Sequence, residues 1–263
     1  MGRCQLIAPG KTLQVIVIIV SFVLLIFSIR RAKAGKVPKI RKIACLEALP
    51  ELVGRCAEKG APLHFATGFR GLDTSEAAIV TAGYAMLGHA AELCGKYKVP
   101  IHYTCVYGYN IPIAQDLIKS GYLKAGHPEL YREDMVTYVG ESQIPYMAAL
   151  MGYIMREKPA ANMLFGGIMW ETLNTLGAAA IAGCMQAAGT PRMFYQPFLV
   201  ASCDYSMIGD ELFAAAAMVR GTPDELGGIE GTDFLKMAFL VLAILAVALL
   251  TAGSKWFLEI ARR

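Results

Sequence analysis

The stretch PLHFATGFRGLDTSEAAIVTAGYAMLGHAAELCGKYKVPIHYTCVY (residues 62–107) decides the fold, because it contains a complete strand–helix–strand unit. Its two ends, PLHFATG (62–68) and IHYTCVY (101–107), are short apolar runs of the kind that forms buried strands. Between them, residues 75–97 show a helical pattern introduced by the capping residue Thr74. Two strands that are joined through a helix of this length lie parallel in one sheet.

The same alternation of strands and helices continues toward the carboxyl end. We expect strands at residues 136–140 and 161–167 and helices at residues 143–157 and 209–221, while the runs 177–184 and 198–204 fit either a helix or a buried strand. Such alternation is typical of α/β proteins. The sequence therefore predicts a Rossmann-like, mostly parallel sheet with helices on both faces.

Two long uncharged segments flank this region. Residues 12–29 contain 18 residues without a charge, and residues 237–253 contain 17. A helix rises about 1.5 Å per residue, so each segment is close to the roughly 20 residues that cross a hydrocarbon core of ~30 Å. We therefore expect one transmembrane helix at each end. The expected order is a short N-terminal tail (1–11), a transmembrane helix (12–29), a basic juxtamembrane segment (30–42), the Rossmann-like domain (43–221), a Gly-rich acidic linker (222–236), a second transmembrane helix (237–253) and a C-terminal tail (254–263).

The charges of the chain are divided unevenly. Residues 30–42 hold seven basic residues and no acidic one, whereas residues 43–235 hold 12 Lys and Arg against 20 Asp and Glu. Basic residues beside a span stay on the cytoplasmic side and attract anionic headgroups, so we expect a cytoplasmic main domain and membrane lipid as a partner. The tail residues Lys255, Arg262 and Arg263 oppose this orientation but are fewer. An acidic domain repels polyanions, so no nucleic-acid partner is expected.

Residues that follow the expected strands are the candidates for binding a ligand, because ligands of open parallel sheets bind beyond the carboxyl ends of the strands. The residues that we select on this basis are Arg70, Tyr109, Asn110, Glu171 and Asp204. They would bind a small-molecule ligand, which the sequence does not identify. Turn and capping positions favour the same residue types, which is the structural alternative.

Motifs that identify an enzyme or a cofactor site are not found in the sequence. The glycines after the first expected strand read GxxG rather than GxGxxG, and no GxxxxGK[ST] occurs. His64 and His102 lack the companions of a metal site, so we interpret them as core histidines. We therefore predict no catalytic residue, no metal site and no cofactor. An enzyme that uses Glu141 and Glu171 as acid and base stays open as an alternative.

Small side chains favour close contacts between helices. They gather in GAAAIAGCMQAAG (177–189), in AAAA (214–217) and along one side of the helix expected at residues 75–97. We expect them to serve packing inside the domain and contact between copies of the chain. The leading functional hypothesis is a membrane-anchored protein that self-assembles as a scaffold or a ring. The alternative is a ligand-binding or sensory module that uses the strand ends.

Several segments resemble one known family. They are PLHFATG, EDMVTYVG, EKPAANMLFGGIMWETL and PFLVASCDYSMIGDELFAAAAMV, within residues 60–230. These segments are similar to a family of bacterial and archaeal membrane proteins described as domain of unknown function 6754. The resemblance implies a membrane-anchored Rossmann-like domain, and hence an integral protein of a prokaryotic plasma membrane. It implies no activity, cofactor or catalytic residue.

Overall fold

The structure is a computed structural model that describes residues 12–251. The tails expected at residues 1–11 and 254–263, and the last two residues of the second expected span, lie outside the described residues. The chain divides into two compact units. One contains the residues up to 40 together with those from 221 onward, and the other contains residues 41–220.

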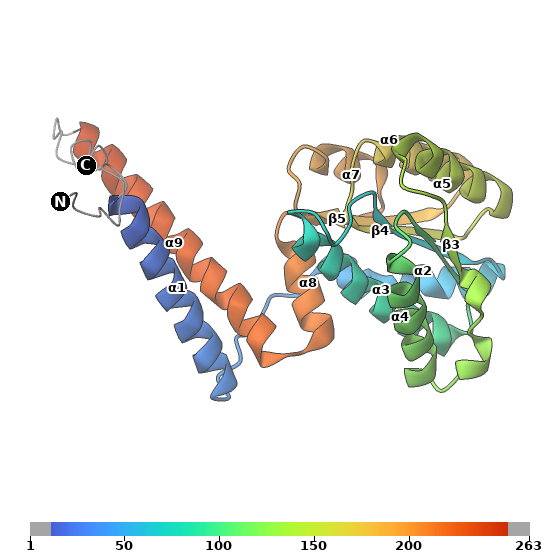
Figure 1. Ribbon diagram of the computed structural model, residues 1–263, viewed down its shortest axis with the longest axis horizontal. Helices are drawn as coiled ribbons and strands as arrows, with labels where there is room; N and C mark the ends of the chain where they lie inside the picture. Colours follow the sequence, from blue (N-terminus) through green and yellow to red (C-terminus); the bar gives the residue numbers. More distant parts are fainter. Residues whose placement is uncertain (1–11, 252–263) are drawn as a thin grey trace, which may run out of the picture. The chain divides into compact units, whose positions relative to one another are not determined.

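The larger unit is built on one parallel sheet, shown in Figure 1. Its strands are β1 (Leu63–Gly68), β2 (Ile101–Cys105), β3 (Val136–Tyr138), β4 (Ala161–Gly167), β5 (Met185–Thr190) and β6 (Tyr205–Ile208). They are arranged in the order β3-β2-β1-β4-β5-β6, and every neighbouring pair is parallel. This is the strand order of doubly wound nucleotide-binding folds, with the order reversing between β1 and β4. The predicted α/β class is confirmed.

Helices cover both faces of the sheet. On one face lie α2 (Ala44–Lys59), α3 (Ala77–Tyr97), α4 (Asn110–Lys124) and α8 (Glu211–Arg220), and on the other lie α5 (Gln143–Glu157), α6 (Glu171–Ala182) and α7 (Gln196–Ser202). Two 3₁₀ turns, η1 (Pro128–Leu130) and η2 (Glu133–Met135), precede β3. Strand residues alternate between the two cores, so Leu63 and Phe65 of β1 join the first core while Ala66 joins the second.

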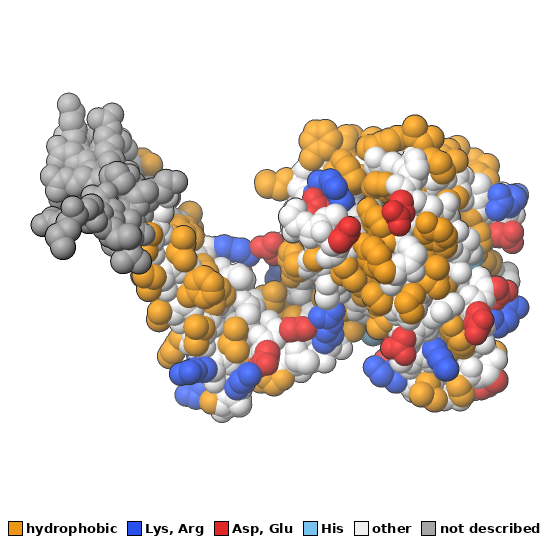
Figure 2. Space-filling view, viewed as in Figure 1, with side chains coloured by type: hydrophobic (Ala, Val, Ile, Leu, Met, Phe, Trp, Pro, Cys, Tyr) orange, Lys and Arg blue, Asp and Glu red, His pale blue; other side chains and the backbone are white. Residues whose placement is uncertain are grey.

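The two helical layers differ on their outer surfaces, and we name them for this difference. The charged layer (α2, α3, α4 and α8) exposes ionic side chains such as Glu51, Arg55, Asp116 and Lys119. The apolar layer (α5, α6 and α7) is covered mainly by hydrophobic side chains, which appear along the upper edge of the domain in Figure 2.

Both ambiguous runs are resolved as helix for most of their length. Residues 177–184 continue α6 as far as Ala182, and residues 198–204 contain the end of α7. β5 and β6 were not predicted as separate strands. β5 has the sequence MQAAGT, which lacks the β-branched and aromatic residues that mark strands until its last position, and it forms because it pairs with β4 and β6.

A row of polar side chains crosses the sheet beneath the apolar layer. His102, His64, Asn162 and Gln186 occupy matching positions on β2, β1, β4 and β5. His64 Nδ1 donates to Asn162 Oδ1 at 2.7 Å, and its Nε2 lies 3.2 Å from Thr104 Oγ1. Burial lowers the pKa of His64 and of His102 to about 4. The contacts of His64 agree with its interpretation as a core histidine, whereas His102 is only partly buried and stacks on Tyr153.

The smaller unit contains two long helices, α1 (Thr12–Lys33) and α9 (Pro223–Thr251), which run antiparallel and pack against each other (Figure 1). Among the described residues, α3 and the Pro223–Ala248 part of α9 are long and apolar enough to cross a membrane. α3 is mostly buried within the α/β domain, which explains its hydropathy. The part of α9 is 6% buried, so burial in the protein does not explain its hydropathy.

The segment 222–236, which we expected to be a linker, is helical from Pro223 onward. Its glycines serve helix packing. A Cβ atom on Gly227 would lie 2.8 Å from Ala32 Cβ of α1, and one on Gly231 would lie 2.9 Å from Leu25 Cδ2. Glycines four residues apart allow two helices to approach closely, so the Gly-rich composition here indicates an interface rather than a flexible connection.

Candidate functional site

The candidate site lies beyond the carboxyl ends of β1 and β4, where the strand order reverses. β1 leads to α3 in the charged layer, whereas β4 leads to α6 in the apolar layer, so the two loops diverge at this point. Ligands of open parallel sheets bind in such a crevice. The same edge of the sheet also receives the loops that follow β2, β3 and β5.

Glycines bring the ends of β1 and β4 into close contact. Gly68 and Gly166 have φ angles of +82° and +140°, which side-chain-bearing residues rarely adopt. A Cβ atom on Gly167 would overlap with the Cβ atom of Arg70. The backbone N–H of Arg70 donates to the Gly167 carbonyl at 3.3 Å. The loop after β1 is therefore held against the end of β4, which fixes the position of Arg70.

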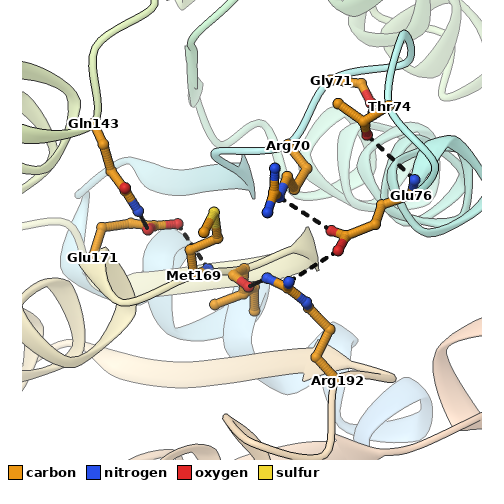
Figure 3. Close-up of polar contacts among 9 residues, drawn as sticks. Arg70, Gly71, Thr74, Glu76, Gln143, Met169, Glu171 and Arg192 are labelled. Atoms are coloured by element: carbon orange, nitrogen blue, oxygen red, sulfur yellow. Dashed lines mark hydrogen bonds and ion pairs between the residues drawn. The ribbon is translucent and has the colours of Figure 1, made fainter.

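Two arginines share one carboxylate at this point (Figure 3). Arg192 Nη2 lies 2.9 Å from Glu76 Oε1, and Arg70 Nε lies 3.4 Å from Glu76 Oε2. Arg192 Nη1 also donates to the Ile168 carbonyl at 3.2 Å. Arg70, Glu76 and Arg192, which we call the arginine–glutamate cluster, come from the loop after β1, the start of α3 and the loop after β5.

The arginine–glutamate cluster is partly exposed and incompletely paired. The side chains of Arg70, Arg192 and Glu76 are 33%, 25% and 19% exposed. Arg70 Nε and Glu76 Oε2 are buried atoms that form no hydrogen bond with the described part of the chain, although they are close enough for an ion pair. Two guanidinium groups and one carboxylate leave a net charge of one positive unit.

Glu171 lies beside this cluster at the start of α6 (Figure 3). Its carboxylate accepts hydrogen bonds from Gln143 Nε2 at 2.7 Å and from the Met169 backbone N–H at 3.0 Å. Burial raises the pKa of Glu171 above its ordinary value, although these donors oppose the shift. A cavity of about 10 Å³ lies next to it, lined in part by Gly68 and Tyr146, and has room for about one water molecule.

Four of the five residues that we selected from the sequence lie at this edge. Arg70 and Glu171 lie at the ends of β1 and β4, as described above. Tyr109 follows β2, donates to Asp73 Oδ1 at 2.7 Å and stacks on Tyr107 with ring centres 5.2 Å apart. Asn110 is buried at the start of α4, and its Oδ1 has no hydrogen-bond partner among the described residues.

The predicted position of Asp204 is wrong. We selected it because it closes the apolar run 198–204, which fitted either a helix or a buried strand, but this run contains the end of α7, and Asp204 directly precedes β6. It therefore lies at the opposite edge of the sheet, where its Oδ2 accepts a hydrogen bond from the backbone N–H of Gln186 at 2.7 Å. Its contact is with the start of β5, so it has no part in the candidate site.

Sequence reasoning missed Glu76, Arg192 and Gln143. Glu76 lay inside an expected helix, and Arg192 followed β5, a strand that was not predicted. Only the parallel pairing of β5 with β4 brings Arg192 to the same edge as Arg70. One feature of the sequence could have pointed to Arg192. It follows the run of small residues that forms β5, and taking this run as a buried strand would have placed Arg192 at a strand end.

Two further observations on the described residues concern ligands and metals. A groove of about 300 Å³ lies at the opposite edge of the sheet, near the start of β2, and is lined by Lys98, Tyr122 and Arg132 among others. No group of three or more His, Cys, Asp or Glu side chains in the described part of the chain is arranged to hold a metal ion.

Comparisons with known proteins agree with the resemblance carried by the quoted segments. No curated protein and no solved structure matches the chain. The family model described as "Domain of unknown function (DUF6754)" matches residues 3–261, nearly the whole length, and the chain therefore belongs to this family.

Proposed function

We propose that the protein is a membrane-anchored scaffold whose cytoplasmic α/β domain assembles with copies of itself through the apolar layer. The observation that carries this proposal is the outer surface of α5, α6 and α7, which is hydrophobic and exposed. A folded domain in water normally covers such a layer with charged side chains, and a large exposed apolar patch is typical of an interaction surface.

The exposed side chains of this surface are large. Ile181 at the end of α6 is 78% exposed, and Met193 and Phe194 in the loop before α7 are 83% and 76% exposed. Ile144, Leu173 and Val200 add further apolar area from all three helices. Charges are rare in this region, where Arg156, Glu157, Lys158, Glu171 and Arg192 are the only ones between residues 142 and 203.

The small-residue segments of the sequence favour α6 as the centre of the contact. Ala82 and Ala85 of α3 are buried, as are Ala215 and Ala216 of α8, so these residues serve packing inside the domain. α6 instead exposes Gly177 and Ala180 beside Leu173 and Ile181. Small residues between large ones provide a shallow surface on which a second copy can pack closely.

Membrane anchoring is the second part of the proposal. α1 and α9 expose apolar side chains such as Phe22, Phe27, Leu240 and Ile244. The pair fits a hairpin that crosses the bilayer twice, with the basic residues after position 29 at the cytoplasmic side. Anchors of this kind would hold many copies in one plane, which lowers the entropic cost of assembly.

The test is the particle mass of the full chain after gentle extraction from its own membrane. We expect a closed assembly of several copies for the wild-type chain. Ile181→Asp places a charge in the proposed contact, where burial of an unpaired carboxylate is costly, so this variant should dissociate into smaller particles.

Leu123→Asp is the matched control, because Leu123 is 62% exposed on α4 in the charged layer. This variant should keep the wild-type mass. A wild-type chain that is a single monodisperse monomer, or an Ile181→Asp variant whose mass equals that of the wild type, contradicts the proposal.

A further inference from the structure

The arginine–glutamate cluster has the composition of an anion-binding site in which a protein carboxylate occupies the anion's place. Arg192 pairs with Glu76 at 2.9 Å, but Arg70 approaches the same carboxylate only to 3.4 Å and its buried Nε forms no hydrogen bond among the described residues. One carboxylate thus satisfies one guanidinium well and the other poorly. An anion with more oxygen atoms and more charge would satisfy both.

A phosphate group matches these unmet requirements. Arginine binds phosphate with two parallel N–H···O hydrogen bonds, and a phosphate monoester offers three acceptor oxygens and a charge of about −1.5 to −2 at pH 7. The single charge of Glu76 leaves the cluster positive by one unit, whereas a phosphate in its place would bring the charge close to zero. The exchange would therefore improve both the hydrogen bonding and the charge balance.

The position of Glu76 allows such an exchange. It precedes Ala77, the first residue of α3, and its side chain forms no capping hydrogen bond to the free N–H groups of its own helix. Within the described part of the chain, its carboxylate is held by the two arginines, and it is partly exposed. A rotation of this one side chain would open the space between Arg70 and Arg192 without moving the sheet.

An aromatic surface lies next to the loop that carries Arg70. Tyr107 and Tyr109 stack on each other after β2, and Tyr109 is 41% exposed. Both tyrosines lie close to the loop after β1. Tyr109 donates to Asp73 of this loop, and Gly71 approaches Tyr107 so closely that a Cβ atom on it would lie 2.9 Å from Tyr107 Cε2. A ring attached to a phosphate in the cluster would find a stacking partner in this pair.

We propose that Arg70 and Arg192 bind the phosphate group of a small aromatic phosphate ester, such as a nucleoside monophosphate, which displaces Glu76, while Tyr107 and Tyr109 contact its ring. The carboxylate of Glu76 thus competes with the phosphate for the two arginines and lowers the affinity for the ligand. The proposal does not rest on assembly, although Arg192 directly precedes Met193 and Phe194 of the surface proposed for it.

The test measures equilibrium binding of AMP and of inorganic phosphate to the full chain in nanodiscs of neutral lipid, at constant ionic strength. Glu76→Gln removes the competing charge at nearly constant volume, so we expect at least tenfold tighter binding of both probes. Arg192→Met should abolish binding of both. Tyr109→Leu should weaken the binding of AMP and leave that of phosphate unchanged.

Arg132→Met is the control, because Arg132 pairs with Asp134 near the start of β3, away from the cluster. It should bind both probes as the wild type does. Misfolding cannot produce a gain in affinity, so tighter binding by Glu76→Gln would support the site directly. Unchanged affinity in that variant, or full binding by a folded Arg192→Met variant, overturns the phosphate site. Equal affinity for AMP and phosphate in the wild type overturns the role of the tyrosines.

Discussion

The two helical layers of the α/β domain differ in where their polar groups lie. In the charged layer these groups are on the outer surface, and in the apolar layer they are in the interior, against the sheet. The charged layer has an apolar interior, with Leu49, Leu87 and Tyr103 fully buried, and an ionic exterior. Beneath the apolar layer, by contrast, lies the buried row that contains His64, Asn162 and Gln186, while hydrophobic side chains such as Ile181 are exposed.

The difference teaches that the two layers are stabilised for different surroundings. Ionic side chains are well solvated by water, whereas large apolar side chains are not. The outer surface of the charged layer is therefore stable in water in an isolated domain. The apolar layer exposes area that water does not stabilise, and it keeps polar groups in its interior at the cost of desolvation. The contact between copies that we propose would cover this exposed area.

The largest expected effect is on the unfolding free energy, when the same substitution, Leu to Ala, is made in each of the two layers. Leu87 is fully buried in α3, so Leu87→Ala should cost about 2–5 kcal/mol of unfolding free energy. Leu173 is 44% exposed on α6, and Leu173→Ala should stay within about 0.5 kcal/mol, as is usual for surface substitutions. Thermal unfolding of the full chain in nanodiscs that each hold one copy measures both, because contact between copies would otherwise bury Leu173. A cost at Leu173 as large as that at Leu87 would show that the apolar layer is internal core.

The buried polar row predicts how stability depends on pH. The folded state lowers the pKa of His64 from 6.5 to about 4, so the unfolded chain binds more protons between these values. Stability from His64 is therefore complete above pH 6.5 and is lost as the pH falls toward 4. The shift corresponds to at most about 3 kcal/mol.

The variant His64→Asn should flatten this pH dependence, which is measured as the unfolding temperature between about pH 4 and pH 7. It should not abolish the dependence, because burial also lowers the pKa of His102. Leu87→Ala is the control, since it lowers stability without removing a titrating group and should keep the wild-type steepness. A His64→Asn variant as steep as the wild type would mean that folding does not lower the pKa of His64.

Much of the fold was predictable from local patterns. The apolar runs that became β1, β2 and β4 are rich in aromatic or branched residues and lie between helices with clear caps or turns. β5 was not predictable in this way, because its residues AAG carry little strand preference and the strand forms by pairing on both sides. β6 was also not predicted, and it is an edge strand of only four residues. Asp204 was assigned to the wrong edge of the sheet because β6, which begins directly after it, was not predicted.

The candidate site was predictable only in part, for a related reason. Arg70 and Glu171 follow strands that the sequence reveals, so their edge of the sheet was known in advance. That Arg192 would meet Glu76 depends on the strand order, which places β5 next to β4 and β4 next to β1. Strand order is a property of long-range pairing and is not present in any single segment.

The smallest expected effect is a change with pH in the stability contributed by Glu171, which lies in the polar interior of the apolar layer. Burial raises the pKa of this carboxyl, so the folded state binds its proton more tightly than the unfolded chain does. The stability that Glu171 contributes is complete below its ordinary pKa and is lost as the pH rises through the folded value, which is opposite to the trend of His64. Glu171→Gln cannot ionise. Its single amide oxygen can accept from Gln143 Nε2 or from the Met169 N–H, which the two carboxylate oxygens accept separately in the wild type, and the loss of one of these hydrogen bonds does not depend on pH.

The unfolding temperature of Glu171→Gln relative to the wild type should therefore increase from about pH 5 to pH 8. The effect is small because the two hydrogen bonds to the carboxylate oppose the burial. Glu141→Gln, at an exposed position after β3, is the control that removes one negative charge without this burial. A Glu171→Gln variant that loses stability relative to the wild type as the pH rises would mean that the ionised carboxylate is the favoured form in the folded state.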